Sequence, residues 1–242
     1  MRLMTKNYFI LFVLIMCAGF VSAKKKDETF TVKMGNPLII LQEKKKAILE
    51  IDYSKMMVLP DKEDEDIMPF REWMISQDED NEEWIKDWEE KDSAECYKAF
   101  RDYFNKEIEK GMKITKLGKD YKVTLRINEI YLGKHIKGGK LALAVVVGGG
   151  WALNSSRKNG IASGELQIQN LQTGETELII EFKNFVGEES LSQIGRIKGI
   201  YENLSEKINE YLEDYQEEYE KQQKKEEKLR KKELKKAGKN KE

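Results

Sequence analysis

The chain has 242 residues, which suits one domain with extensions or two small domains. It carries 43 Lys and Arg against 44 Asp and Glu, so no strong overall charge points to a partner. Its two cysteines and single histidine exclude a disulfide-rich scaffold and a zinc site built from several Cys and His ligands.

Residues 1–23 have the layout of a secretory signal peptide. Arg2 and Lys6 precede the apolar run YFILFVLIMCAGF, and small residues lead up to Ala23, after which Lys24 begins a charged stretch. We expect cleavage after Ala23 and export to the periplasm, the cell envelope or the exterior. Lipidation of Cys17 is not expected, because Met16 stands where that signal needs a small residue.

Two short apolar runs follow, at residues 37–42 and 47–53. In the second, Ala47, Leu49 and Ile51 alternate with more polar neighbours, which predicts a strand with one buried face. The charged residues 43–46 between the runs suit an exposed turn.

Residues 61–92 are acidic and contain three tryptophans. Trp84 and Trp88 are four residues apart, so on a helix they share one face. We favour packing of this face onto the body; the alternative is a platform on which sugars or peptidoglycan stack.

A second helix is predicted over residues 93–110. Asp92 and Glu95 have the spacing of a capping box, and Gly111 is placed to end the helix. The apolar stripe of this helix consists of Cys96, Phe100, Tyr103, Phe104 and Ile108.

Beyond Gly111 the hydrophobic period changes from 3.6 to 2. Residues 112–115 read as a short strand, and residues 121–127 as a strand with one wet face. Residues 162–168 and 178–182 pair as a hairpin, because Gln172-Thr173-Gly174-Glu175 between them is a glycine-bearing turn.

The stretch LALAVVVGGGW at residues 141–151 is too short for a membrane helix and lacks phosphate-loop spacing. We favour a strand buried on both faces, with a sharp reversal at the glycines. A hairpin that binds a partner or touches lipid is the alternative. Its residues are Gly148, Gly149, Gly150 and Trp151.

A final helix is predicted from about residue 188, with its apolar stripe ending at Tyr219. Residues 221–242 hold eleven Lys and Arg against four Glu, so an acidic body at 24–220 carries a basic tail. The tail is expected to be a helix end or disordered, and it could lie on an anionic surface.

Few residues are suited to catalysis. A Cys–His dyad would require Cys96, on an apolar helix face, to meet His135, in a Lys- and Gly-rich turn. We therefore predict a protein that is not an enzyme and that has no cofactor, metal or nucleic acid as ligand.

The segments AILEIDYSKMMV, AFRDYFNKEIEKGMKI, YKVTLRINEIYLG and GELQIQNLQTGETELIIEFKNF make the chain similar to uncharacterised secreted proteins and envelope lipoproteins of Bacteroidetes. The resemblance spans most of residues 24–242. It implies a small α+β fold in which helices cover one face of a sheet, as in periplasmic assembly factors. It implies no activity.

The sequence therefore predicts one α+β domain: a mainly antiparallel sheet of five to seven strands with two long helices on one face. The predicted function is binding of an envelope protein or envelope polymer, with homo-oligomer formation possible. The alternative is a carbohydrate- or lipid-binding module that uses the Trp-rich helix or the glycine-rich hairpin.

Overall fold

The computed structural model describes residues 29–42, 44–59, 66–77, 85–108, 110–133, 158–190 and 192–239. The strands are β1 (Phe30–Gly35), β2 (Lys46–Asp52), β3 (Met57–Leu59), β4 (Met68–Pro69), β5 (Lys113–Ile114), β6 (Tyr121–Tyr131), β7 (Lys158–Asn170) and β8 (Thr176–Ser190). The helical elements are the 3-10 turn η1 (Pro37–Leu41), α2 (Phe70–Gln77), the π-helical segment η2 (Trp88–Asp92), α4 (Ser93–Glu107) and α7 (Gln193–Lys239).

These strands form an eight-stranded mixed sheet in the order β1-β8-β7-β6-β2-β5, with β3 on β6 and β4 on β3. The prediction of a mainly antiparallel sheet with five to seven strands is therefore wrong in detail. β2 runs parallel to both β6 and β5, and β3 runs parallel to β6. Parallel strands need a long connection, and the chain between β2 and β6 supplies one that includes α2 and α4.

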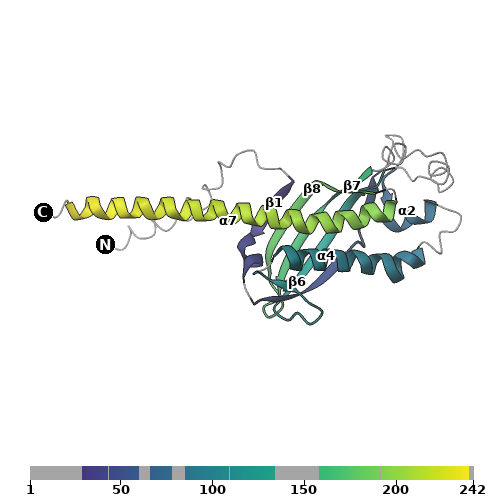
Figure 1. Ribbon diagram of the computed structural model, residues 1–242, viewed down its shortest axis with the longest axis horizontal. Coiled ribbons are helices and arrows are strands. Elements are labelled where there is room, and N and C mark those ends of the chain that lie inside the picture. The colour runs from purple at the N-terminus through teal and green to yellow at the C-terminus, as the bar shows by residue number, and fades with distance from the viewer. Residues whose placement is uncertain are drawn as a thin grey trace, which may run out of the picture.

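Helices α4 and α7 lie side by side on one face of the sheet, as predicted (Figure 1). α7 crosses β8 and β7, and α4 lies over β2 and β5. The core between the layers includes fully buried Phe100, Leu125, Leu166, Phe182 and Leu204.

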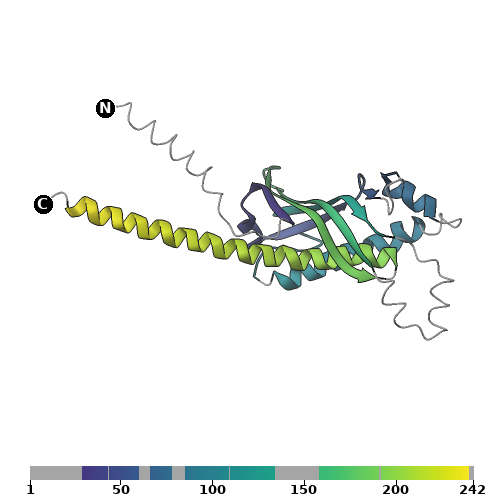
Figure 2. The same cartoon turned by 90° about the horizontal axis from the view of Figure 1, so that it is seen from above.

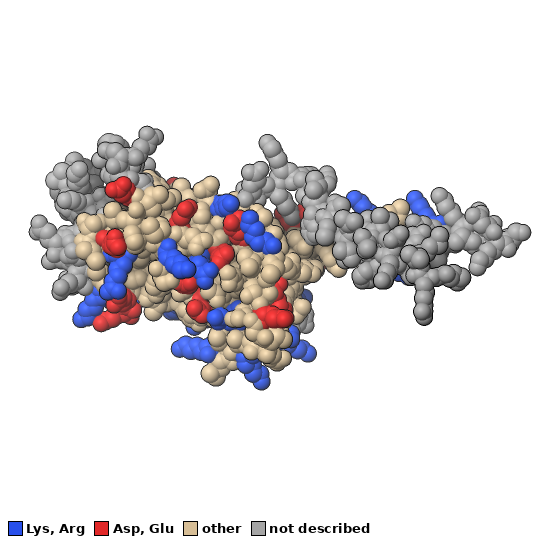
Figure 3. Space-filling model, turned by 180° about the vertical axis from the view of Figure 1, so that it is seen from behind, with Lys and Arg blue, Asp and Glu red and all other residues tan. Residues whose placement is uncertain are grey.

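Basic and acidic side chains are interspersed over the opposite face of the sheet (Figure 3). Arg126 on β6 joins two neighbouring strands: its Nε lies 2.9 Å from Asp52 Oδ2 and its Nη1 lies 2.5 Å from Glu165 Oε1. The Ser54 hydroxyl and Arg126 together lower the pKa of Asp52 to about 2.

The predicted β7–β8 hairpin is confirmed. Gly174 has φ +77°, its amide donates to Asn170 O at 2.9 Å, and the Asn170 amide donates to Glu175 O at 2.9 Å. Glycine adopts this left-handed conformation without steric cost, which is why the turn forms here.

Two predicted helix starts are wrong. Asp92 has helical φ and ψ and makes no side-chain cap bond, because residues 85–92 already form helix and α4 continues from them. α7 begins at Gln193 rather than near residue 188, because β8 extends to Ser190 before the chain turns. The predicted strands at 47–53 and 112–115 are confirmed as β2 and β5.

α7 approaches the sheet closely where β8 has no side chain. A Cβ at Gly187 would lie 2.8 Å from Ile200 N and 2.9 Å from Ile200 Cα. Glycine at this position lets the helix backbone reach the strand, and the contact holds the first half of α7 in place.

Candidate functional site: the projecting C-terminal helix

The distal part of α7 extends beyond the body as a single rod (Figures 1 and 2). Leu212 is the last α7 residue in the core, and Tyr211 makes a ring contact with Phe30 of β1 at 5.5 Å. We call residues 213–239 the projecting helix. Its 27 residues span about 40 Å at 1.5 Å per residue.

Local interactions account for the helix without packing. Strong helix formers, chiefly Lys, Glu, Gln and Leu, fill the segment. Three Glu-to-Lys pairs at i,i+4 support it: Glu217–Lys221 at 3.0 Å, Glu220–Lys224 at 3.9 Å and Glu227–Lys231 at 2.6 Å. Each such pair stabilises a helix by about 0.2–0.5 kcal/mol.

The apolar stripe of α7 ends within the first turns of the rod. Tyr215 contacts Tyr211, with ring centroids 6.4 Å apart, and Tyr219 is 41% exposed. The heptad positions Ile194, Tyr201, Ile208 and Tyr215 lead to Gln222, and those of Ile197, Leu204 and Tyr211 lead to Glu218. Leu229 is 59% exposed, with no apolar neighbour at heptad spacing on either side. A coiled-coil seam needs apolar residues at both positions of every heptad, and the sequence lacks this pattern from residue 218 onward.

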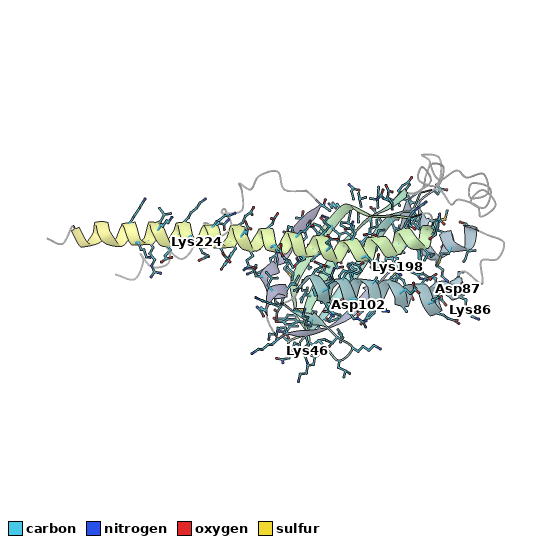
Figure 4. The ribbon with its side chains drawn as sticks, viewed as in Figure 1. Lys46, Lys86, Asp87, Asp102, Lys198 and Lys224 are labelled. Atoms are coloured by element: carbon cyan, nitrogen blue, oxygen red, sulfur yellow. The ribbon has the colours of Figure 1, made fainter. Side chains whose placement is uncertain are left out.

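Lysines are concentrated on one side of this rod. By helical register, eight positions fall within an arc of about 120°. We call them the lysine stripe: Lys221, Lys224, Lys225, Lys228, Lys232, Lys235, Lys236 and Lys239. Lys224 extends from the rod well away from the body (Figure 4). The hydrogen bond to Glu217 raises the pKa of Lys221.

An acidic stripe precedes the lysine stripe on the same side of α7. By helical register its positions span an arc of about 140° around the helix axis, centred near that of the lysine stripe. They are Glu206, Glu210, Glu213, Asp214, Glu217 and Glu218. The buried residues Leu204, Ile208 and Leu212 lie on the opposite side of the helix. The outer side of α7 therefore changes sign abruptly between Glu218 and Lys221.

The sequence predicted a basic tail but missed this one-sided arrangement. Lysines spaced three, four and seven apart are the signal that reveals it. The structure adds that α7 runs unbroken across residue 220 to Lys239, so residues 221–239 are helical.

Trp88 lies in the core rather than on a binding surface. It is 2% exposed and makes edge contacts with Phe70 at 5.0 Å and with Tyr53 at 5.6 Å. Its ring thus has no free face for a ligand, which agrees with the packing interpretation. Trp84 and the remaining candidate positions lie outside the described residues: Ala23, Gly148, Gly149, Gly150 and Trp151.

The end of β6 and the end of β8 are fixed at the opposite end of α7 from the rod. Gln193 Nε2 donates to Gly133 O at 3.3 Å. The buried Arg196 guanidinium donates to the carbonyls of Leu132 and Ser190. Burial lowers the pKa of Arg196. Arg196 therefore ties the end of β6 and the end of β8 to the first turns of α7.

The described residues present no reactive constellation. Cys96 is buried, and its burial raises the pKa of the thiol to about 12, which disfavours the nucleophilic thiolate. His135 lies outside the described residues. Within the described ranges, no three or more His, Cys, Asp and Glu side chains gather as metal ligands. None of the described helices combines the length and apolar character needed to cross a bilayer.

No protein-family model matches the chain, and no curated protein matches it. Among solved structures, it is similar to the PelC dodecamer from Paraburkholderia phytofirmans, with a TM-score of 0.32 and 5% identity over 75% of this chain and 96% of that one. A PelC variant dodecamer from the same organism gives a TM-score of 0.32 and 8% identity, over 76% and 98% of the two chains. Likenesses this weak carry no argument about fold or function.

Proposed function

We propose that this protein is a non-enzymatic component of the cell envelope that attaches to an anionic surface through its projecting helix and carries a globular body that binds a protein partner. The signal-peptide pattern of residues 1–23 supports export. The observation that carries the proposal is the charged helix itself: residues 221–239 hold ten Lys and Arg against three Glu, beyond the last core residue.

A second copy is the competing occupant of this helix. In an antiparallel pair centred on Lys221, the acidic stripe of each copy would face the lysine stripe of the other. However, exposed ion pairs contribute only about 0–1 kcal/mol each, and association costs about 4–15 kcal/mol. Without an apolar seam such a pair is weak.

An anionic surface is the better match. Each Lys close to an anionic lipid surface contributes about 1 kcal/mol, and a surface engages all eight lysines of the stripe together. This attraction acts over a Debye length of about 8 Å at physiological salt, so it weakens as salt is added.

Co-sedimentation tests the attachment. The chain from Lys24 to Glu242 and a version ending at Glu220, which keeps every buried α7 residue, are mixed with peptidoglycan sacculi and with anionic liposomes. We expect only the longer chain to pellet at low salt and high salt to release it. Equal pelleting of both versions, or of neither, would refute attachment through the helix.

A further inference from the structure

The lysine stripe also indicates what shape of anionic partner it fits. We propose that the projecting helix lies on the planar surface of an anionic lipid bilayer with its lysine stripe facing the headgroups, while the acidic stripe keeps the body off that surface. This inference rests on the proposed function and names the surface to which the helix attaches.

One-sidedness favours a plane. Eight cationic positions share an arc of about 120° along about 27 Å of helix. A flexible polyanion can wind around a rod and reach cations on every side, so it gains nothing from this arrangement. A flat surface reaches one side only, and all eight positions lie there.

The residue type agrees with mobile lipid headgroups. By register, Arg230 falls on the side opposite the stripe, so the stripe is composed entirely of lysine. Lys presents a compact charge on a flexible stem, whereas Arg suits fixed bidentate recognition of one phosphate group. Lysines can therefore follow headgroups that diffuse.

The helix is built to lie on the surface rather than insert into it. An inserting amphipathic helix needs an apolar face beside its cations. The side away from the stripe instead carries Glu226, Glu227 and Glu233, and Leu229 stands without an apolar neighbour at heptad spacing. Contact is consequently electrostatic and reversible.

The acidic stripe sets where contact begins. Glu210, Asp214 and Glu217 lie on the side that faces the bilayer, and the same anionic surface repels them. Lys207, whose Nζ lies 2.7 Å from Glu210 Oε2, is also on this side, but the six carboxylates of the acidic stripe outnumber it. Repulsion N-terminal to Lys221 and attraction beyond it confine the contact to the helix from Lys221 onward, so the body stays off the surface.

A variant with exchanged neighbours provides a matched test. The variant keeps the composition and net charge because it exchanges three neighbouring Lys and Glu pairs: Lys225→Glu/Glu226→Lys, Glu227→Lys/Lys228→Glu and Lys232→Glu/Glu233→Lys. They place three Glu in the stripe and move three Lys to the other side. All six positions lie beyond the last core residue, and circular dichroism checks that helix content is retained.

The variant and the wild-type chain are titrated with phosphatidylcholine vesicles containing phosphatidylglycerol, and with poly-glutamate as a flexible polyanion. We expect the exchange to weaken vesicle binding about 100-fold or more, and poly-glutamate binding by no more than about threefold. Equal vesicle binding by both chains would overturn the stripe. If the wild-type chain binds poly-glutamate or sacculi but not vesicles, the bilayer is refuted as the partner, whereas the proposed attachment through the helix is retained. A wild-type chain that binds no anionic probe would overturn both.

Discussion

Substitution of Gly187 by Ala tests the packing that holds α7 on the sheet. The new Cβ would lie 2.7 Å from Ile200 Cγ1, 2.8 Å from Ile200 N and 2.9 Å from Ile200 Cα. Two of these atoms are helix backbone, so α7 itself must move. Overpacking of this kind costs about 1–3 kcal/mol.

Ala also lowers the entropy of the unfolded chain, which returns up to about 1 kcal/mol. We therefore expect Gly187→Ala to lower the free energy of unfolding by about 1–2 kcal/mol, measured by urea titration. For a domain of this size the midpoint temperature should fall by about 2–8 °C. The control is Val186→Ala, because Val186 is 48% exposed on the other face of β8 and its change should cost under about 0.5 kcal/mol.

Gly160 provides a second test of the contact with Ile200. A Cβ at Gly160 would lie 2.9 Å from Ile200 Cδ1, the end of a flexible side chain. Ile200→Val removes that atom, so it should reduce the cost of Gly160→Ala while leaving the cost of Gly187→Ala unchanged. If the free energy of unfolding of Gly187→Ala lies within about 0.5 kcal/mol of the wild-type value, the close contact does not hold α7 on the sheet.

Three further outcomes are expected. The pKa of Asp52 is about 2 in the folded chain and 3.8 without its partners, so the stability it contributes is present above about pH 4 and is lost as the pH falls to 2. Arg126→Met should therefore lower the free energy of unfolding by about 1 kcal/mol at pH 7 and by progressively less in urea titrations at acid pH. A difference that stays constant with pH would contradict this. Arg196→Met should cost about 2–4 kcal/mol, because the carbonyls of Leu132 and Ser190 lose a buried donor; a thermal melt like that of wild type would contradict their pairing. The Cys96 thiol should react with a disulfide reagent at pH 8 only after denaturant is added, and rapid reaction of the native chain would show that its site is open.

Local periodicity predicted a good part of the fold. The alternation at residues 121–127, 162–168 and 178–182 predicted three central strands. A period of two identifies the buried face of a strand whichever strand it pairs with. The turn at Gly174 anticipated their hairpin. The apolar stripe of α7 was evident as far as it packs. β1 was missed, although Phe30 and Val32 alternate, because the run is short and its neighbours are mixed.

Strand direction required the tertiary structure. No pattern within residues 46–52 indicates that β2 pairs with β6 in parallel. The partner strand lies some seventy residues away, and the direction of pairing depends on how α2 and α4 cross over. The misplaced start at Asp92 has a similar cause. Capping-box residues were present, but burying Trp88 against Phe70 and Tyr53 favoured helix through that position.

The charged face of the projecting helix depends partly on the sequence and partly on the tertiary structure. The sequence alone determined which residues share a side, because helical register depends only on spacing, and it determined the change of sign at residue 221. Only the tertiary structure decided that this side faces outward and that the rod leaves the body after Leu212. Those facts depend on where the sheet ends beneath α7, and residues distant in the chain set that boundary.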